Sequence, residues 1–306
     1  MTLISDEELA RRLDLIEAFA GVPRHVEELP GGLTNRNVKV TTPHGVYVAR
    51  CTDPSSNLLG IDRDQECFNS RAAEQAGVGA QVVDYRPDLG VLLIAFLKGT
   101  ALSNADFQRP GVVAKAASAI RQLHAGPRFS GDFNMFELQP EYLKTIQGNG
   151  FRIPADYLDY ADRFRSIAEV LTGTDSTTVP CHNDLLAANF IEDGQVMWLI
   201  DYEYSGNNDP CFELGNVWSE CGLTLDQLDE LVTAYYGERL RHKIARARLQ
   251  GIVSKYGWTL WGCIQNGASA LDFDFWSWAI ERYDSAVAEF NSTDFTRLLD
   301  DAQATD

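Results

Sequence analysis

Three polar side chains in the second half of the chain have the types and spacing that phosphoryl transfer requires. Asp184 and Asn189 are five residues apart, and Asp201 directly follows the apolar run 196–200. In phosphoryl transfer a carboxylate orients the attacking hydroxyl, while an amide and a second carboxylate hold Mg²⁺ against the nucleotide phosphates. Taken singly, each residue would be an ordinary solvated loop residue. Together they predict that Asp184 orients the hydroxyl and that Asn189 and Asp201 bind the metal ion.

A β-hairpin is expected to bring these three side chains together. Asp193-Gly194 is typical of a two-residue type I′ turn, and apolar residues flank it on both sides. The residues before the first strand and after the second then meet at the open end of the hairpin. This geometry holds Asp184, Asn189 and Asp201 at one place.

The order of these motifs resembles the choline/ethanolamine kinase family, within the wider group of protein-kinase-like proteins and aminoglycoside phosphotransferases. CHNDLLAAN at 181–189 and IDYEY at 200–204 carry the resemblance, and further matching stretches extend it over most of the chain. It implies an α+β, two-lobed protein-kinase-like fold with a small antiparallel sheet in the N-terminal lobe and a larger, mainly helical C-terminal lobe. The nucleotide-binding lobe, with a leading helix, is expected at residues 1–98, and the catalytic and acceptor-binding lobe at residues 99–306.

The N-terminal third has the pattern of a leading helix and a small sheet. Ser5 and Glu8 read as a capping box, and apolar residues then recur at helical spacing as far as Ala20. The other elements expected here are strands at 25–29, 37–41, 45–50, 81–85 and 91–96, and a helix at 62–76.

The segment 30–35 is the candidate phosphate-binding loop. Gly31 and Gly32 allow backbone N–H groups to approach an anion, and the side chains of Thr34 and Asn35 are further donors. From these residues alone a plain hairpin loop is the favoured interpretation, since the segment is not a Walker A loop and lacks G-x-G-x-x-G. The family resemblance identifies GGLTN as the loop that covers the phosphates.

Four further nucleotide-site residues follow from the resemblance. Arg50 stands where many kinases carry the phosphate-binding lysine, and its guanidinium is able to bind phosphate bidentately. Glu66 is the expected ion-pair partner of Arg50, as opposed to a surface carboxylate on a helix. Phe96 and Leu97 lie in the expected connector between the lobes, whose backbone would bond the adenine edge.

Helices dominate the expected C-terminal lobe. They are predicted at 107–124, at 157–171 and over almost the whole chain beyond Asn216, whereas 126–149 is loop-rich and 172–178 is a polar linker. His124 and His182 are interpreted as structural residues, because Asp184 holds the place of the base. The basic run at 239–248 is expected to be a solvated helix face rather than a nucleic-acid site.

The acceptor site is predicted from tryptophans near the C-terminus. Trp258 and Trp261 are three residues apart and share a helix face, and Trp278 follows. A quaternary ammonium group cannot donate hydrogen bonds, so aromatic faces and a nearby carboxylate bind it best. A tryptophan-rich core would explain the same residues, but the resemblance implies a cation-binding cage. The neighbours expected in this site are Glu203, Tyr204, Glu220 and Gln265, with Glu203 facing either the metal or the substrate cation.

Two positions depart from the family pattern. Trp278 stands where the family more often has Tyr, which keeps the aromatic face and loses a hydroxyl. Glu213 stands where the family usually has Asp, and the longer side chain is expected to shift the neighbouring loop.

Composition narrows the class of protein. The chain of 306 residues has 45% apolar and 10% aromatic residues, which are globular values, and its net charge of −18 argues against a nucleic-acid partner. An acidic surface favours a cationic substrate, although solubility or a salty habitat is the favoured explanation of the charge. Scattered cysteines, a polar and acidic N-terminus and short apolar runs predict a reduced, cytoplasmic protein without membrane insertion.

Three functions are consistent with these features. The first is an ATP- and Mg²⁺-dependent kinase that phosphorylates the hydroxyl of choline, acting as a monomer or homodimer on a small cationic amino alcohol. The second keeps the chemistry but uses ethanolamine, another amino alcohol or an aminoglycoside. The third, a silent nucleotide- or choline-binding module, is disfavoured because Arg50, Asp184, Asn189 and Asp201 are all present. A protein kinase is disfavoured because the short interval between Asp201 and Asn216 leaves no room for an activation loop.

Overall fold

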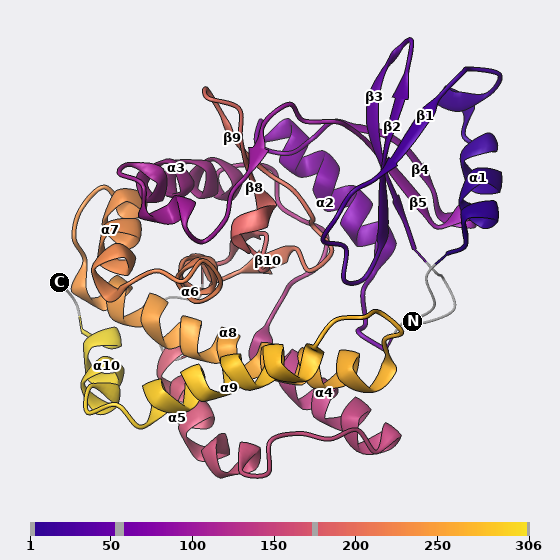
Figure 1. The fold of residues 1–306 in the computed structure, drawn as a ribbon. Coiled ribbons are helices and arrows are strands. Elements are labelled where there is room, and N and C mark those ends of the chain that lie inside the picture. Colours follow the sequence, from indigo (N-terminus) through magenta and orange to yellow (C-terminus); the bar gives the residue numbers. More distant parts are fainter. Residues whose placement is uncertain (1–3, 53–57, 173–176, 305–306) are drawn as a thin grey trace.

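An antiparallel sheet and two helices form the N-terminal part of the molecule, and helices form most of the rest (Figure 1). The computed structural model describes residues 4–52, 58–172 and 177–304. The sheet has five strands in the order β1-β2-β3-β5-β4. The strands are β1 (His25–Glu28), β2 (Arg36–Thr42), β3 (Gly45–Cys51), β4 (Val82–Arg86) and β5 (Val91–Ala95). The predicted α+β class, with a small antiparallel sheet followed by a mainly helical part, is confirmed.

Two helices accompany this sheet, α1 (Asp6–Asp14) and α2 (Arg63–Gln75). Ser5 caps α1 by accepting a hydrogen bond from the backbone N–H of Glu8, as predicted. The carboxylate of Glu8 binds Arg11 and Arg12. The helix ends earlier than expected, because a short 3₁₀ turn follows it and turns Ile16 and Phe19 into the core beneath the sheet.

The C-terminal part is built around one long buried helix, α8 (Arg241–Ala268). Every residue of α8 from Ala245 to Gln265 is buried, and α4, α6, α9 and α10 all pack against it. Such a helix has no solvent face, so its polar residues must find partners inside the protein. The other helices are α3 (Val112–His124), α4 (Met135–Asn149), α5 (Ala161–Thr172), α6 (Pro210–Glu220), α7 (Leu225–Tyr236), α9 (Phe275–Phe290) and α10 (Phe295–Ala302).

Two small sheets frame the segment that carries the predicted catalytic residues. β7 (Val179–Cys181) pairs with β10 (Gly206–Asn208), and β6 (Thr100–Ala101), β8 (Phe190–Glu192) and β9 (Met197–Leu199) form a three-stranded sheet. The backbone N–H of Ile200 donates to the carbonyl of Asn189 at 3.0 Å. The predicted hairpin is therefore present, and its open end joins the positions expected.

The predicted turn type of this hairpin is wrong. Glu192 pairs with Met197, so the connection has four residues, and Gly194 has a positive φ (93°) whereas Asp193 does not. A type I′ turn needs two consecutive positive φ values. The carboxylate of Asp193 instead accepts hydrogen bonds from the N–H groups of Gln195 and Val196 and from the indole of Trp198. These side-chain bonds stabilise a longer loop.

The prediction of a loop-rich region at 126–149 is also wrong, because its second half is the helix α4. Asn134 caps α4, and Pro140 lies inside it. An internal proline removes a backbone donor, so its presence in a sequence predicts a break in the helix. The burial of Met135, Tyr142 and Ile146 in the C-terminal core outweighs that local cost.

The basic run at 239–248 is only partly a solvated face. Arg246 and Arg248 are buried, and Arg246 donates to the carboxylate of Asp209 at 2.6 Å. Arg248 pairs with Glu289 and Asp294. Because a buried guanidinium needs carboxylate partners, these two arginines fix α8 to the start of α6 and to the end of α9.

Two further predictions, the linker and the lobe boundary, are not tested by the structure. The linker predicted at 172–178 lies mainly outside the described residues, and the lobe boundary at residue 98 stays a prediction, since α2 shares core contacts with α3 beyond it. Among the described helices, none has both the length and the hydropathy needed to cross a bilayer.

The cap of α7 gives a test of the fold. Thr224 and Gln227 form the predicted capping box, with both reciprocal hydrogen bonds present. Thr224→Ala should lower the free energy of unfolding by about 1 kcal/mol, because it leaves a helix N–H without its acceptor. Urea denaturation measures the change, and Thr296→Ala, an exposed position within α10, serves as the control. Equal stability of the two variants would contradict the role of the cap.

Candidate active site

The loop that carries Asp184 is fixed to helix α6 through its backbone. The carboxylate of Glu213 accepts hydrogen bonds from the N–H groups of His182 (2.8 Å) and Asn183 (2.7 Å). The side chain of Asn216, one turn further along α6, accepts from the N–H of Leu185 at 2.7 Å. Three backbone donors of the loop are thus held by two side chains of one helix, which sets the direction in which Asp184 points.

Glu213 is fully buried and carries a charge there. Burial alone would raise its pKa, but the neighbouring His124, whose Nε2 lies 3.5 Å away, and the loop N–H groups lower the pKa below its usual value. The longer side chain, expected to shift the loop, reaches two consecutive N–H groups at once. His124 also bonds the hydroxyl of Tyr235 through Nδ1 at 2.8 Å, in keeping with the predicted structural role.

His182 is part of the scaffold of this loop. Its Nε2 lies 2.7 Å from the carbonyl of Ile200, and its Nδ1 lies 3.3 Å from the N–H of Asp184. The neutral tautomer with a proton on Nε2 satisfies both contacts. Burial lowers the pKa of His182, which keeps the ring neutral. The histidine therefore ties the Asp184 loop to the strand that leads into Asp201.

Asp184 is half-buried among other acidic groups. Burial first, and then the negative charges of Glu220, Asp201 and Glu203, raise its pKa well above the usual value for an aspartate. The positive charge of Arg282 opposes this effect. A carboxylate whose pKa is raised in this way is a better proton acceptor, which suits a residue that orients a hydroxyl group.

The predicted metal ligands Asn189 and Asp201 offer oxygen atoms of the kind Mg²⁺ prefers. The Nδ2 of Asn189 donates to the carbonyl of Asp184 at 2.8 Å, which directs its Oδ1 away from that carbonyl. Asp201 has a positive φ (76°), an unusual conformation for a residue other than glycine, and one of its oxygens contacts Arg50 at 2.5 Å. An amide oxygen and a carboxylate oxygen fit a hard cation.

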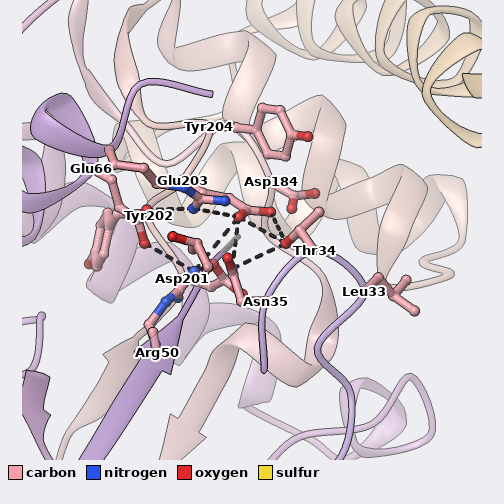
Figure 2. Close-up of polar contacts among 12 residues, drawn as sticks. Leu33, Thr34, Asn35, Arg50, Glu66, Asp184, Asp201, Tyr202, Glu203 and Tyr204 are labelled. Carbon is pink, nitrogen blue, oxygen red and sulfur yellow. Dashed lines mark hydrogen bonds and ion pairs between the residues drawn. The ribbon is translucent and has the colours of Figure 1, made fainter. Parts of the chain in front are cut away.

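Buried charges of both signs join the sheet, α2 and the segment after Asp201 (Figure 2). Arg50, on β3, contacts Glu66 of α2 at 3.0 Å and Glu203 at 3.7 Å. Burial alone would lower the pKa of Arg50, but the carboxylates of Asp201, Glu66 and Glu203 outweigh it, so the guanidinium stays charged. The expected pair of Arg50 and Glu66 is present, and Glu66 is not a surface residue.

Arg63 is a member of this cluster that the sequence analysis missed. It contacts Glu66 at 2.6 Å and Glu203 at 3.1 Å. Its spacing of three residues from Glu66 on a helix was the available signal. The spacing shows that the two could pair, but not that Glu203, far away in sequence, completes the set.

The phosphate-covering loop lies against Glu203. The hydroxyl of Thr34 donates to Glu203 at 2.8 Å, and the amide of Asn35 donates to it at 3.0 Å. Gly31 has a φ of 99°, and a Cβ on Gly32 would lie 2.2 Å from the carbonyl oxygen of Asn35. Both glycines are therefore required by the backbone conformation of the loop, and its contact with phosphate stays a prediction.

The connector between β5 and β6 carries the predicted adenine-binding residues. The N–H of Phe96 donates to the carbonyl of Val46 at 3.0 Å. The N–H of Phe96 is therefore already used within the protein, so Phe96 can offer an adenine edge only its carbonyl oxygen. The next backbone N–H along the connector is that of Leu97. The roles of both residues stay predictions.

The predicted acceptor residues gather on one side of the Asp184 loop. The indole N–H of Trp261 donates to the hydroxyl of Tyr204 at 2.7 Å, and the Tyr204 and Trp258 rings meet edge to face at 4.9 Å. The rings of Trp261 and Trp278 are 5.0 Å apart. Trp258, Trp261 and Tyr204 belong to the C-terminal core, and their role in binding a cation stays a prediction.

Arg282 is the second residue that the sequence analysis missed in this region. Its guanidinium lies 3.3 Å from the centre of the Trp278 ring and forms an ion pair with Glu220. The spacing of four residues between Trp278 and Arg282 on α9 was the available signal. Gln265, expected beside the substrate, donates its amide to the backbone carbonyl of Leu33 at 3.1 Å.

Comparisons with known proteins bear on the family of the chain. A sequence profile of choline/ethanolamine kinases matches residues 26–232. Protein LicA of Haemophilus influenzae is 25% identical over 272 residues, which cover 84% of this chain and 77% of that protein. Human ethanolamine kinase 2 is 34% identical over 283 residues, which cover 82% of this chain and 72% of that protein.

Solved structures give the same result. A choline/ethanolamine kinase family protein from Mesorhizobium loti has a TM-score of 0.85 at 31% identity, covering 97% of this chain and 98% of that one. The choline kinase LicA from Streptococcus pneumoniae has a TM-score of 0.79 at 24% identity, covering 94% of this chain and 99% of that one, and shows that the fold is shared.

The contact between Glu213 and the loop can be tested by its effect on stability. Glu213→Gln should lower the free energy of unfolding by about 1–3 kcal/mol, because a buried N–H of the loop loses its acceptor. Because the folded-state pKa of Glu213 is lowered, the advantage of the wild type should be complete above about pH 4.3 and decrease as the pH falls further. Denaturation at pH 7 and below pH 4 measures both effects.

The matched control is Glu238→Gln, at an exposed position between α7 and α8. It should leave stability almost unchanged at both pH values. A Glu213→Gln variant as stable as this control would show that the loop does not depend on the carboxylate.

Proposed function

The chain belongs to the choline/ethanolamine kinase family, and we propose that it transfers the γ-phosphoryl group of ATP to the hydroxyl group of choline. Kinases of this family transfer phosphoryl groups to alcohols. The aromatic acceptor side, next to Asp184, supports choline among the possible alcohols.

The residues around Asp184 supply the chemistry of this proposal. Asp184 accepts a hydrogen bond from the substrate hydroxyl and directs its oxygen toward the phosphorus atom. Arg50 and the loop 30–35 provide positive charge and N–H donors for the phosphates. Asn189 and Asp201 would hold Mg²⁺, which when bound neutralises charge on the phosphate oxygens.

The observation that favours choline over ethanolamine is the state of Glu220. A primary ammonium group donates three hydrogen bonds and needs free carboxylates, whereas a trimethylammonium group needs aromatic faces. Glu220 is already paired with Arg282, while Trp258, Trp261 and Tyr204 provide aromatic surface. This arrangement suits the quaternary cation better than the primary one.

Turnover of an acceptor panel tests the proposal. With ATP and Mg²⁺, the purified protein should show the highest kcat/KM with choline, a lower value with ethanolamine and none with an aminoglycoside, measured as ADP release. Asp184→Asn should reduce kcat with choline by about 100-fold or more, because the amide is a poor proton acceptor.

Asp300→Asn, at an exposed position on α10, is the control and should retain full activity. A higher kcat/KM with ethanolamine would replace choline by the second acceptor. Binding of choline and nucleotide without any turnover would support the silent-module hypothesis instead.

The dependence of activity on pH gives an independent test of Asp184. The carboxylate must be ionised to accept the hydrogen bond, and its pKa is raised, so kcat/KM should fall on acidification at a higher pH than for an ordinary aspartate. Glu220→Gln removes a negative charge that raises this pKa, so the acidic limb of the plot of kcat/KM against pH should move to lower pH. Glu238→Gln should leave the limb in place. A limb that does not move in Glu220→Gln would exclude Asp184 as the group that titrates.

A further inference from the structure

The loop that covers the phosphates is bonded to the helix that carries the acceptor tryptophans. The amide of Gln265 donates to the backbone carbonyl of Leu33 at 3.1 Å, and Gln265 is only 1% exposed. On α8, Gln265 lies four residues after Trp261 and seven after Trp258, so the three side chains form one row along a single helix face. The loop therefore docks at the end of the aromatic row.

A second set of bonds holds the other side of the same loop. Thr34 and Asn35 donate to Glu203, and the next residue, Tyr204, accepts a hydrogen bond from Trp261. The contacts run from the loop to Glu203 and Tyr204, on to Trp261 of α8, and back through Gln265 to the loop. They form a closed ring around the acceptor side of the site, and the loop is one part of that ring.

Leu33 is the apolar residue at the centre of this loop. It is half-buried and packs against the C-terminal core, the core that includes Trp258, Trp261 and Tyr204. Figure 2 shows Leu33 beyond Thr34, on the side away from Arg50 and the charged cluster. Its neighbours Gly31 and Gly32 share a hollow with Leu271, from the turn between α8 and α9. The polar residues of the loop thus face Glu203, while Leu33 faces the acceptor lobe.

We propose that Leu33 forms one wall of the acceptor site and that Gln265 positions it there, so that the phosphate-covering loop limits the size of the cationic head group. This inference rests on the proposed amino-alcohol kinase function. A trimethylammonium group makes no hydrogen bonds, and its binding depends on close apolar and aromatic contact. The tryptophans of α8 and α9 provide contact from the C-terminal lobe, and Leu33 provides it from the nucleotide side.

Kinetics with two acceptors test the wall. Leu33→Ala should raise KM for choline by about tenfold, because the cation loses an apolar contact. The ratio of kcat/KM for the N-triethyl analogue to kcat/KM for choline should rise by about tenfold, because the site gains space. Because the backbone of the loop is retained, KM for ATP should change by less than about twofold. Leu33→Phe should act in the opposite direction on the analogue and lower its relative kcat/KM.

Gln265→Glu tests the positioning role with an isosteric side chain. A carboxylate cannot donate to the carbonyl of Leu33, so KM for choline should rise by about tenfold, as in Leu33→Ala, and the preference between choline and the analogue should weaken. The matched control is Leu158→Ala, which removes an exposed leucine far from the site and should behave as the wild type.

The outcomes separate the inference from the proposed function. Two results would contradict the proposed role of Leu33. One is an equal rise in KM for ATP and for choline; the other is a ratio of kcat/KM between the analogue and choline that stays unchanged in both Leu33 variants. If the wild type turns over ethanolamine instead of choline, the same comparison is made with ethanolamine and its N-alkyl analogues. Absence of turnover with every amino alcohol would overturn the proposed function and the wall together.

Discussion

A buried charge must be paired, and this requirement connects the parts of the site. Arg50 and Arg63 enter from the sheet and from α2, while Glu66, Asp201 and Glu203 face them. Two guanidinium groups face three carboxylates, so removing either arginine would leave buried negative charge without compensation. The cluster therefore fixes the position of α2 and β3 relative to the segment that carries Asp201, and with it the distance between the phosphate-binding groups and the predicted metal ligands.

Helix α6 fixes the position of the segment that carries Asp184 in a similar way. Glu213 and Asn216 bind three N–H groups of that loop, and Asn183 takes a left-handed conformation (φ 68°) within it. A loop of this kind would be flexible by itself, but three of its backbone donors are bound by side chains of a rigid helix. Asp184 can thus be held among other carboxylates, where its pKa is raised. Favourable packing elsewhere in the protein offsets the unfavourable free energy of this arrangement.

The aromatic residues of α8 belong to the C-terminal core and are also the predicted acceptor residues. Trp258 and Trp261 are almost fully buried and contribute to the packing of the C-terminal helices. They also border Tyr204 and lie in one row with Gln265, which bonds the loop that covers the phosphates. The stability of the lobe and the shape of the acceptor side are consequently set by the same contacts.

Several features could be predicted from the sequence because they depend on local pattern. Periodicity located the five strands and most helices, the capping box of α7 follows from Thr224 and Gln227, and the CHND and IDYEY motifs identified the family. Local signals failed where distant residues decide. Packing against α8 stabilises α4 in spite of Pro140, and Arg246 and Arg248 are buried with carboxylate partners at the start of α6 and on α9.

The amino-acid sequence by itself determined the reaction class, the elements of the N-terminal sheet and the residue types available to the site. Only the tertiary structure decided that Glu203 binds the loop 30–35, that Arg63 joins Arg50, and that Arg282 pairs with Glu220 over Trp278. The physical reason is that these are long-range pairings of charges and hydrogen-bonding groups. Their partners lie many residues apart, and burial forces them together only when the whole chain has folded.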